Sequence, residues 1–184
     1  MKNKYHLIAL LLFIFSFACK ADGQNENLKL VFIRHAEKPE TGENLTCKGF
    51  NRSLQLPAVL YKKFGQPVDI YVPALDMGKT TESARMFQTI TPFAVKYNLS
   101  INSKYDKTDY TDLGNALVRE KGTVIIVWTH SNMPAIIQFL GVKSPIPKWK
   151  ENDYDSIWIV TYKNKQAILT TDKEGLNPAA TCAF

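Results

Sequence analysis

The sequence predicts a three-layer α/β fold, in which a mostly parallel central sheet lies between helices on both faces. Two apolar runs rich in β-branched residues, Leu28–Ile33 and Thr123–Trp128, have the pattern of buried strands. Amphipathic helical segments alternate with these and other strand patterns, which is typical of a sheet covered on both sides. The 184 residues are enough for one domain with a substantial core.

The N-terminus has the features of an export signal, so we assign residues 1–18 to a signal peptide. Lys2 and Lys4 precede an apolar run that is too short to span a membrane comfortably. The Ala18–Cys19 pair resembles a bacterial lipoprotein cleavage site, which implies a lipid anchor on Cys19. Cleavage of an ordinary signal peptide is the alternative.

Residues 19–27 are expected to be a tether and residues 28–184 the folded domain. The expected location is therefore the cell envelope, either periplasmic or associated with the outer membrane. The alternative is a soluble protein that is periplasmic or secreted.

The first half of the domain contains two strand patterns and two helix patterns. A polar loop follows the first strand, and Thr46 is a suitable N-cap for a helix over Lys48–Phe64 that Gly65 ends. A short strand over Asp69–Pro73 follows, and then a helix over Thr80–Tyr97.

The second half repeats this alternation and ends in a pair of strands. Its expected elements are a weak strand at Leu99–Ser103, a helix at Asp109–Glu120, the strand Thr123–Trp128, a helix at Ala135–Leu140, and strands at Asp155–Tyr162 and Gln166–Thr170. Lys163–Lys165 is the expected turn of the last pair.

Two strands are followed directly by side chains that carry chemistry. Arg34 and His35 follow the first strand, and His130 follows the strand Thr123–Trp128. Ligands of open α/β sheets bind beyond the carboxyl ends of the strands. An arginine there can bind an anion while an adjacent imidazole stays free to react.

Several short motifs resemble those of the histidine phosphatase superfamily, the phosphoglycerate mutase-like proteins. The Arg34–His35 pair resembles its phosphate-pocket motif, in which the histidine takes a phosphoryl group. The other matching segments are an LTxxGxxRA-like pattern with Thr46, Gly49 and Arg52, an RxxQT pattern with Arg85, Gln88 and Thr89, a GHSNTxP-like segment at Val127–Pro134, and a YDxLWVVT-like strand at Asp153–Thr161. They follow the superfamily's order, which implies a phosphoglycerate mutase-like fold.

The resemblance implies a phosphatase that needs neither metal nor cofactor and works through a phosphohistidine. His35 would attack phosphorus, and water would then remove the phosphoryl group. Arg34, Arg85 and His130 would hold the phosphoryl oxygens and stabilise charge in the transition state, with His130 acting best as an imidazolium. Asn132 would add a donor, unless it only caps the following helix.

No motif identifies the acid that protonates the leaving oxygen. Superfamily members usually carry a glutamate or aspartate after the second arginine segment, but this chain has no glutamate between Glu82 and Glu120. Glu37, two residues after His35, is one candidate, although it could instead orient a ring nitrogen. The other candidates are Asp106, Asp109 and Asp112.

Two other interpretations stay open. His35, Glu37 and His130 have the residue types of a His₂-carboxylate zinc site, although two neighbouring arginines would repel the cation. The chain could also be a catalytically weak or inactive surface lipoprotein that binds an anion or a partner.

The expected ligand is a phosphorylated small molecule, a phosphomonoester or phosphoanhydride, with phosphate or a similar anion binding in the same pocket. The formal net charge of +6 includes two lysines of the signal, and the chain has no basic run. Nucleic-acid binding is therefore not expected. A lipid on Cys19 would provide the membrane contact.

Three cysteines and no CxxC pair argue against a structural zinc site. If Cys19 carries the lipid, then Cys47 and Cys182 remain. In an oxidising compartment these two either form a disulfide or stay as free thiols.

Overall fold

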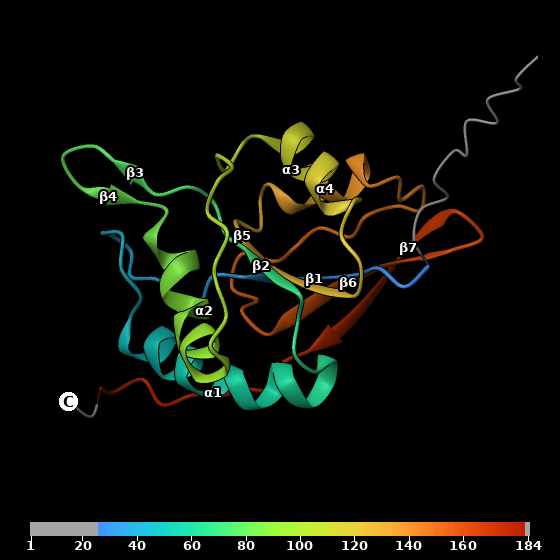
Figure 1. The fold of residues 1–184 in the computed structure, drawn as a ribbon. Coiled ribbons are helices and arrows are strands. Elements are labelled where there is room, and N and C mark those ends of the chain that lie inside the picture. Colours follow the sequence, from blue (N-terminus) through green and yellow to red (C-terminus); the bar gives the residue numbers. More distant parts are fainter. Residues whose placement is uncertain (1–25, 183–184) are drawn as a thin grey trace, which may run out of the picture.

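The computed structural model describes residues 26–182 (Figure 1). The predicted signal peptide, Cys19 and most of the tether lie outside the described residues. Within residues 26–182, no helix is both long and apolar enough to cross a membrane.

The central sheet has five strands in the order β2-β5-β1-β6-β7. β1 pairs in parallel with β5, and β5 pairs in parallel with β2. β6 runs antiparallel to β1, and β7 runs antiparallel to β6, so β6 alone opposes the common direction. The predicted mostly parallel sheet is therefore confirmed. The strands are β1 (Lys29–Arg34), β2 (Asp69–Tyr71), β5 (Thr123–Trp128), β6 (Ser156–Lys163) and β7 (Gln166–Lys173).

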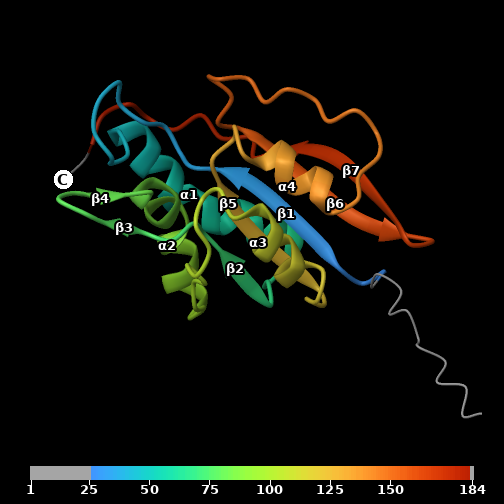
Figure 2. The ribbon, with the colours of Figure 1, turned by 90° about the horizontal axis from the view of Figure 1, so that it is seen from above.

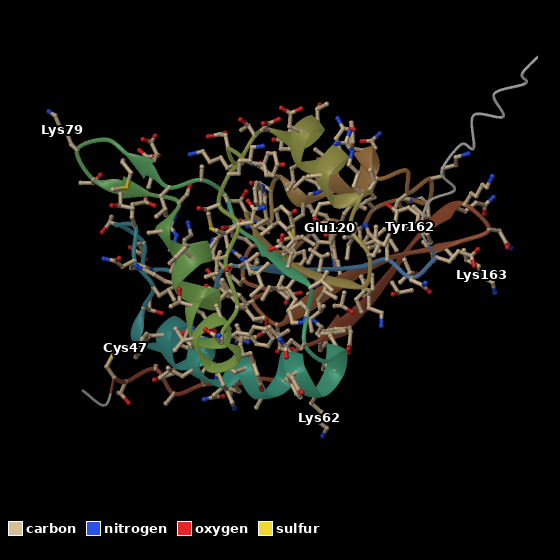
Figure 3. The ribbon with its side chains drawn as sticks, in the orientation of Figure 1. Cys47, Lys62, Lys79, Glu120, Tyr162 and Lys163 are labelled. Carbon is tan, nitrogen blue, oxygen red and sulfur yellow. A yellow bond between two sulfur atoms is a disulfide. The ribbon has the colours of Figure 1, made fainter. Side chains whose placement is uncertain are left out.

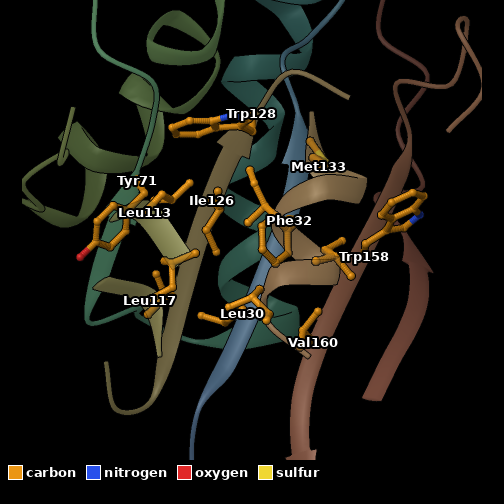
Figure 4. Close-up of a cluster of buried hydrophobic side chains, with 14 of the residues drawn as sticks. Leu30, Phe32, Tyr71, Leu113, Leu117, Ile126, Trp128, Met133, Trp158 and Val160 are labelled. Atoms are coloured by element: carbon orange, nitrogen blue, oxygen red, sulfur yellow. The ribbon is translucent and has the colours of Figure 1, made fainter. Parts of the chain in front are cut away.

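Two pairs of helices cover the two faces of this sheet, as predicted (Figures 1 and 2). α1 (Cys47–Phe64) and α2 (Ala84–Tyr97) pack on one face, and α3 (Tyr110–Leu117) and α4 (Met133–Phe139) pack on the other. Successive residues of a strand point to opposite faces. Val31 therefore joins the core under α1 and α2, whereas Phe32 joins the core under α3 and α4, shown in Figure 4.

Local sequence signals set the ends of the helices. The hydroxyl of Thr46 accepts a hydrogen bond from the Gly49 N–H at 3.1 Å, which is the expected N-cap of α1. Asp109 caps α3 in the same way, through the Asp112 N–H at 3.2 Å. Gly65, with φ of 71°, ends α1 at the predicted position.

The segment before α2 differs from the prediction. The helix expected from Thr80 begins only at Ala84, and a small hairpin precedes it, formed by β3 (Asp76–Met77) and β4 (Thr81–Glu82). The physical reason is Ser83, whose left-handed backbone (φ 59°) separates the hairpin from the helix. Antiparallel pairing decides the conformation of residues 76–82, and helical periodicity does not detect such pairing.

The weak strand predicted at Leu99–Ser103 is reduced to one bridge. Asn102 pairs with Tyr71 of β2, and its N–H donates to the Ile70 carbonyl at 2.8 Å. β7 instead extends to Lys173, beyond the predicted end at Thr170, because it pairs with the full length of β6.

The C-terminal segment returns to the start of α1. Cys47 and Cys182 form a disulfide, and the Cα atoms are 4.9 Å apart. Nearby, the Asn51 side chain donates to the carbonyls of Ala179 and Thr181 at 2.9 and 3.0 Å. Figure 3 shows Cys47 beside this segment. The tail is thus held against the helix that follows the Arg34–His35 loop.

Candidate active site

The imidazole of His35 has a defined orientation at the carboxyl end of β1. Its Nδ1 lies 2.7 Å from the carbonyl oxygen of Ala36. A carbonyl oxygen can only accept, so Nδ1 carries the hydrogen and Nε2 keeps its lone pair. His35 therefore presents a nucleophilic nitrogen.

The surroundings of His35 keep its ring neutral. Burial and the positive charges of Arg34, Arg85 and His130 lower the pKa of His35 to about 4, although its bond to Ala36 opposes the shift. Arg34, His35 and His130 lie at the ends of the paired strands β1 and β5, and α2 supplies Arg85.

Arg34 is a buried cation with unused donors. Its Nη1 donates to the main-chain carbonyls of Glu151 and Asp153, at 2.6 and 3.3 Å. Its guanidinium carbon lies 4.0 Å from the centre of the Tyr154 ring. Its Nε and Nη2 are buried, and among residues 26–182 they have no hydrogen-bond partner. Unpaired buried donors are costly, and an anionic ligand would satisfy them.

A third unpaired group lies on the neighbouring strand. Arg34 is opposite Trp128 in the parallel pairing of β1 and β5, so the residues that follow them, His35 and Thr129, leave the same sheet edge. The Thr129 hydroxyl is buried and has no hydrogen-bond partner among the described residues. Thr129 was not among the predicted site residues, although its place directly before His130 was a usable signal.

His130 presents its Nε2 to the same edge, 3.0 Å from a carboxylate oxygen of Glu151. A carboxylate accepts, so Nε2 carries the hydrogen. Burial, then the charge of Arg34, lowers the pKa of His130 despite this contact. The expected imidazolium is thus disfavoured. A neutral ring with its hydrogen on Nε2 still donates to an anion.

Asn132 takes neither of its two expected roles in full. It is the N-cap residue of α4 but makes no side-chain cap hydrogen bond. Its Nδ2 instead donates to the Lys107 carbonyl at 2.9 Å, and Trp128 Nε1 donates to the same oxygen at 3.0 Å. Asn132 therefore fixes the loop before α3 against the end of β5, and one amide hydrogen stays available to a ligand.

Arg85 lies in the first turn of α2, held by the loop after β1. Its Nη1 donates to the Gly42 carbonyl at 2.7 Å, and its Nη2 lies 3.5 Å from a carboxylate oxygen of Glu43. One turn later, the Thr89 hydroxyl accepts the Ala36 N–H at 2.9 Å. α2 thus supplies a cation and holds the N–H of Ala36, the residue whose carbonyl orients His35.

Glu37 is not placed to serve as an acid or to orient His35. Arg52 donates from Nε and Nη2 to both Glu37 carboxylate oxygens, each at 2.9 Å, and from Nη1 to Glu174. All three side chains are buried, and burial raises the pKa of Glu174 to about 8. The nitrogen that Glu37 was expected to orient is held by Ala36.

Helix α1 reaches Glu37 closely because residue 49 is glycine. The Thr46 N–H donates to the Glu37 carbonyl at 2.9 Å, and a Cβ on Gly49 would overlap that carbonyl. This packing gives the LTxxGxxRA-like pattern a physical meaning. It brings Arg52 and the helix start against the loop that carries His35.

Two of the three aspartate candidates are bound elsewhere, and the third, Asp112, lines a surface hollow. One Asp106 carboxylate oxygen accepts from both the N–H and the hydroxyl of Thr108, and this lowers the pKa of Asp106. Asp109 caps α3. Asp109 and Asp112 line a surface hollow with Lys104 and Tyr105, and neither histidine of the site lines it.

The proposed zinc ligands do not form a cation site. Among residues 26–182, no group of three or more histidine, cysteine, aspartate or glutamate side chains is arranged to hold a metal ion. Glu37, the carboxylate of that alternative, has both oxygens bound by Arg52. The unpaired donors of Arg34 beside the neutral ring of His35 fit an anion better than a cation.

No protein-family model and no curated protein matches the chain. Solved structures do match it. A mycobacterial glucosyl-3-phosphoglycerate phosphatase with inorganic phosphate is 14% identical, with 79% of this chain and 95% of that chain covered and a TM-score of 0.56. The protein histidine phosphatase SixA complexed with tungstate is 13% identical, with 80% and 97% covered and a TM-score of 0.57.

A variant of a phosphoserine phosphatase from Entamoeba histolytica, in complex with phosphoserine, is a third match. It is 11% identical, with 80% of this chain and 97% of that chain covered and a TM-score of 0.50. At identities this low, the structural matches establish the fold alone. The chain therefore has the phosphoglycerate mutase-like fold of the histidine phosphatases.

Proposed function

We propose that the protein is a phosphohydrolase that works through a phosphohistidine on His35. One observation carries the proposal: a neutral His35 with a free Nε2 lies beside Arg34, whose Nε and Nη2 are buried and unpaired among the described residues. A phosphoryl group supplies an electrophilic phosphorus for His35 Nε2 and anionic oxygens for the unpaired donors of Arg34.

The residues support a reaction in two steps. In the first, His35 Nε2 bonds to phosphorus, and the bond between phosphorus and the leaving oxygen breaks. Arg34 and the Nε2–H of His130 are placed to stabilise the charge on the phosphoryl oxygens. In the second, the oxygen of water bonds to phosphorus, the nitrogen–phosphorus bond breaks, and inorganic phosphate leaves.

Arg85 would complete the phosphoryl clamp by exchanging partners. It is held by Gly42 and Glu43, on the loop after β1. A phosphoryl group that carries nearly two negative charges competes well with a single exposed carboxylate for a guanidinium. Binding of substrate is therefore expected to release Glu43 from Arg85.

The substrate class is a phosphomonoester or phosphoanhydride of a small molecule. The structural neighbours, by their descriptions, bind phosphate, tungstate or phosphoserine. The unpaired donors of Arg34 are consistent with an anion of this kind. These donors do not select one leaving group.

We also propose that the domain works outside the cytoplasm, anchored by a lipid on Cys19. The signal-like N-terminus supports this, as does the disulfide between Cys47 and Cys182, because such bonds persist in oxidising compartments. Labelled fatty acid should enter the full chain and not a Cys19→Ser variant. Release of the unlabelled wild-type protein into the soluble fraction would contradict the anchor and favour ordinary signal cleavage.

Brief exposure to an aryl phosphate, followed by intact-mass measurement, tests the enzymatic proposal. The wild-type protein should gain one phosphoryl group. His35→Asn should gain none, and the matched variant His130→Asn should still label, but more slowly. Labelling that persists in His35→Asn refutes the assignment. Phosphate binding without any labelling favours an anion-binding protein.

A further inference from the structure

The structure leaves the leaving oxygen without a proton donor among the carboxylates expected from the sequence. Glu37 is bound at both oxygens by Arg52, and Asp106 and Asp109 are bound within their own loop and helix. Asp112 lines a surface hollow that neither His35 nor His130 lines. An alkoxide is a poor leaving group, and a well-placed acid accelerates its departure by roughly 10²–10⁴-fold. Another carboxylate near the phosphoryl pocket is therefore of interest.

Glu151 is such a carboxylate. Its Oε2 lies 3.0 Å from Nε2 of His130, the atom that would donate to a phosphoryl oxygen. The main chain of the same residue is held in the site, because its carbonyl accepts from Arg34 Nη1 at 2.6 Å. The backbone is thus fixed beside the phosphoryl pocket, whereas the side chain, 68% exposed, is free to change direction.

We propose that Glu151 is the general acid that protonates the leaving oxygen in the reaction proposed above, on which this inference rests. The Glu151 carboxylate occupies the direction in which His130 Nε2 would meet a phosphoryl oxygen. Substrate takes over that hydrogen bond. The carboxylate then lies at the rim of the pocket, within one hydrogen bond of the phosphoryl group.

The proton balance closes over the two steps. In the first, the electron pair of the broken bond stays on the leaving oxygen, and the carboxylic acid of Glu151 gives it a proton. In the second, the Glu151 carboxylate takes a proton from the attacking water. A phosphomonoester has its second pKa near 6, so a monoanionic substrate can bring the first proton.

Substrate would also remove the interaction that lowers the pKa of Glu151, which is the hydrogen bond from His130. A phosphoryl group that takes over this bond adds negative charge beside the carboxylate. Both changes would raise the pKa of Glu151 and so increase the fraction of the protonated acid.

The test compares kcat/KM for an aryl phosphate and a simple alkyl phosphate, because an aryl oxygen leaves easily without a proton. Glu151→Gln should raise the aryl-to-alkyl ratio by roughly 10²-fold or more. The matched control is Glu43→Gln, which removes an exposed carboxylate from Arg85 on another loop of the site. Glu43→Gln should change kcat/KM for both substrates alike, since it removes a charge but no proton donor. The aryl-to-alkyl ratio should therefore stay within about threefold of the wild-type ratio.

Two results would overturn the inference while the phosphohistidine still forms from the aryl phosphate. One is a ratio in Glu151→Gln equal to that in Glu43→Gln. The other is that both substrates react faster in Glu151→Gln and that phosphate inhibits it more tightly. That result would mean that the Glu151 carboxylate only competes with the phosphoryl group for the N–H of His130. Absence of the phosphohistidine in the wild-type protein would overturn the proposed function together with this inference.

Discussion

Replacement of Thr89 tests whether one buried hydroxyl orients the catalytic imidazole. Thr89 is completely buried in α2, and its hydroxyl donates to the Arg85 carbonyl at 2.7 Å while accepting the Ala36 N–H at 2.9 Å. The Ala36 carbonyl in turn accepts from Nδ1 of His35 at 2.7 Å. The hydroxyl therefore holds one side of Ala36, the residue whose carbonyl sets the tautomer of His35.

The expected magnitudes follow from these contacts. Thr89→Val keeps the volume but leaves the Ala36 N–H buried without a partner, which should lower the free energy of unfolding by about 1–3 kcal/mol. Thr89→Ser keeps the hydroxyl and deletes one buried methyl group, which should cost about 1 kcal/mol. Phosphorylation of His35 should slow by about tenfold or more in Thr89→Val, because the nucleophile loses its fixed orientation.

Three measurements check this reasoning. Urea unfolding gives the stabilities, kcat/KM for an aryl phosphate gives the phosphorylation rate, and the nitrogen NMR shifts of His35 report its tautomer. Thr89→Ser should keep the Nδ1–H tautomer, and Thr89→Val should show a mixture. A Thr89→Val protein with the wild-type tautomer and rate would refute a positioning role, even if its stability fell.

Three further outcomes are expected. The pKa of buried His35 is about 4, against 6.5 in the unfolded chain. Its contribution of about 3 kcal/mol to stability should therefore be present above pH 6.5 and lost as pH falls through 4. Activity should fall over the same pH range. Urea titrations of wild type and His35→Asn at pH 7 and 4 check this, and equal pH dependence would contradict it. The disulfide joins two cysteines that are 135 residues apart in the sequence, and its reduction should destabilise the domain by up to about 4–5 kcal/mol. A Cys47→Ser/Cys182→Ser protein should not respond to the reductant. Activity on an aryl phosphate should survive EDTA, and loss with rescue by zinc would restore the zinc interpretation.

The local pattern of the sequence was sufficient for most elements and for part of the site. The strands β1 and β5 are continuous apolar runs that have to be buried, and Thr46 and Gly65 mark the ends of α1 by their own chemistry. Because parallel strands end at the same edge of a sheet, the positions of His35 and His130 could also be predicted.

Features that depend on contacts between distant segments could not be predicted in this way. The hairpin of residues 76–82 exists through pairing across a turn. In the sequence, Glu37 looked available. Arg52 binds Glu37 only after α1 folds back, and Glu174 binds the same arginine only after the C-terminal segment returns.

The same reason explains why Glu151 was missed. Nothing in its neighbourhood in the sequence marks it, since the loop from Pro145 to Asp155 has no periodic pattern. It becomes part of the site because Arg34 binds its carbonyl across 117 residues of chain. The sequence by itself determined that Arg34, His35 and His130 would lie at the same sheet edge, because strand direction places them there. Only the tertiary structure decided which carboxylate joins them, because that depends on how a loop without regular structure folds over a buried, unsatisfied cation.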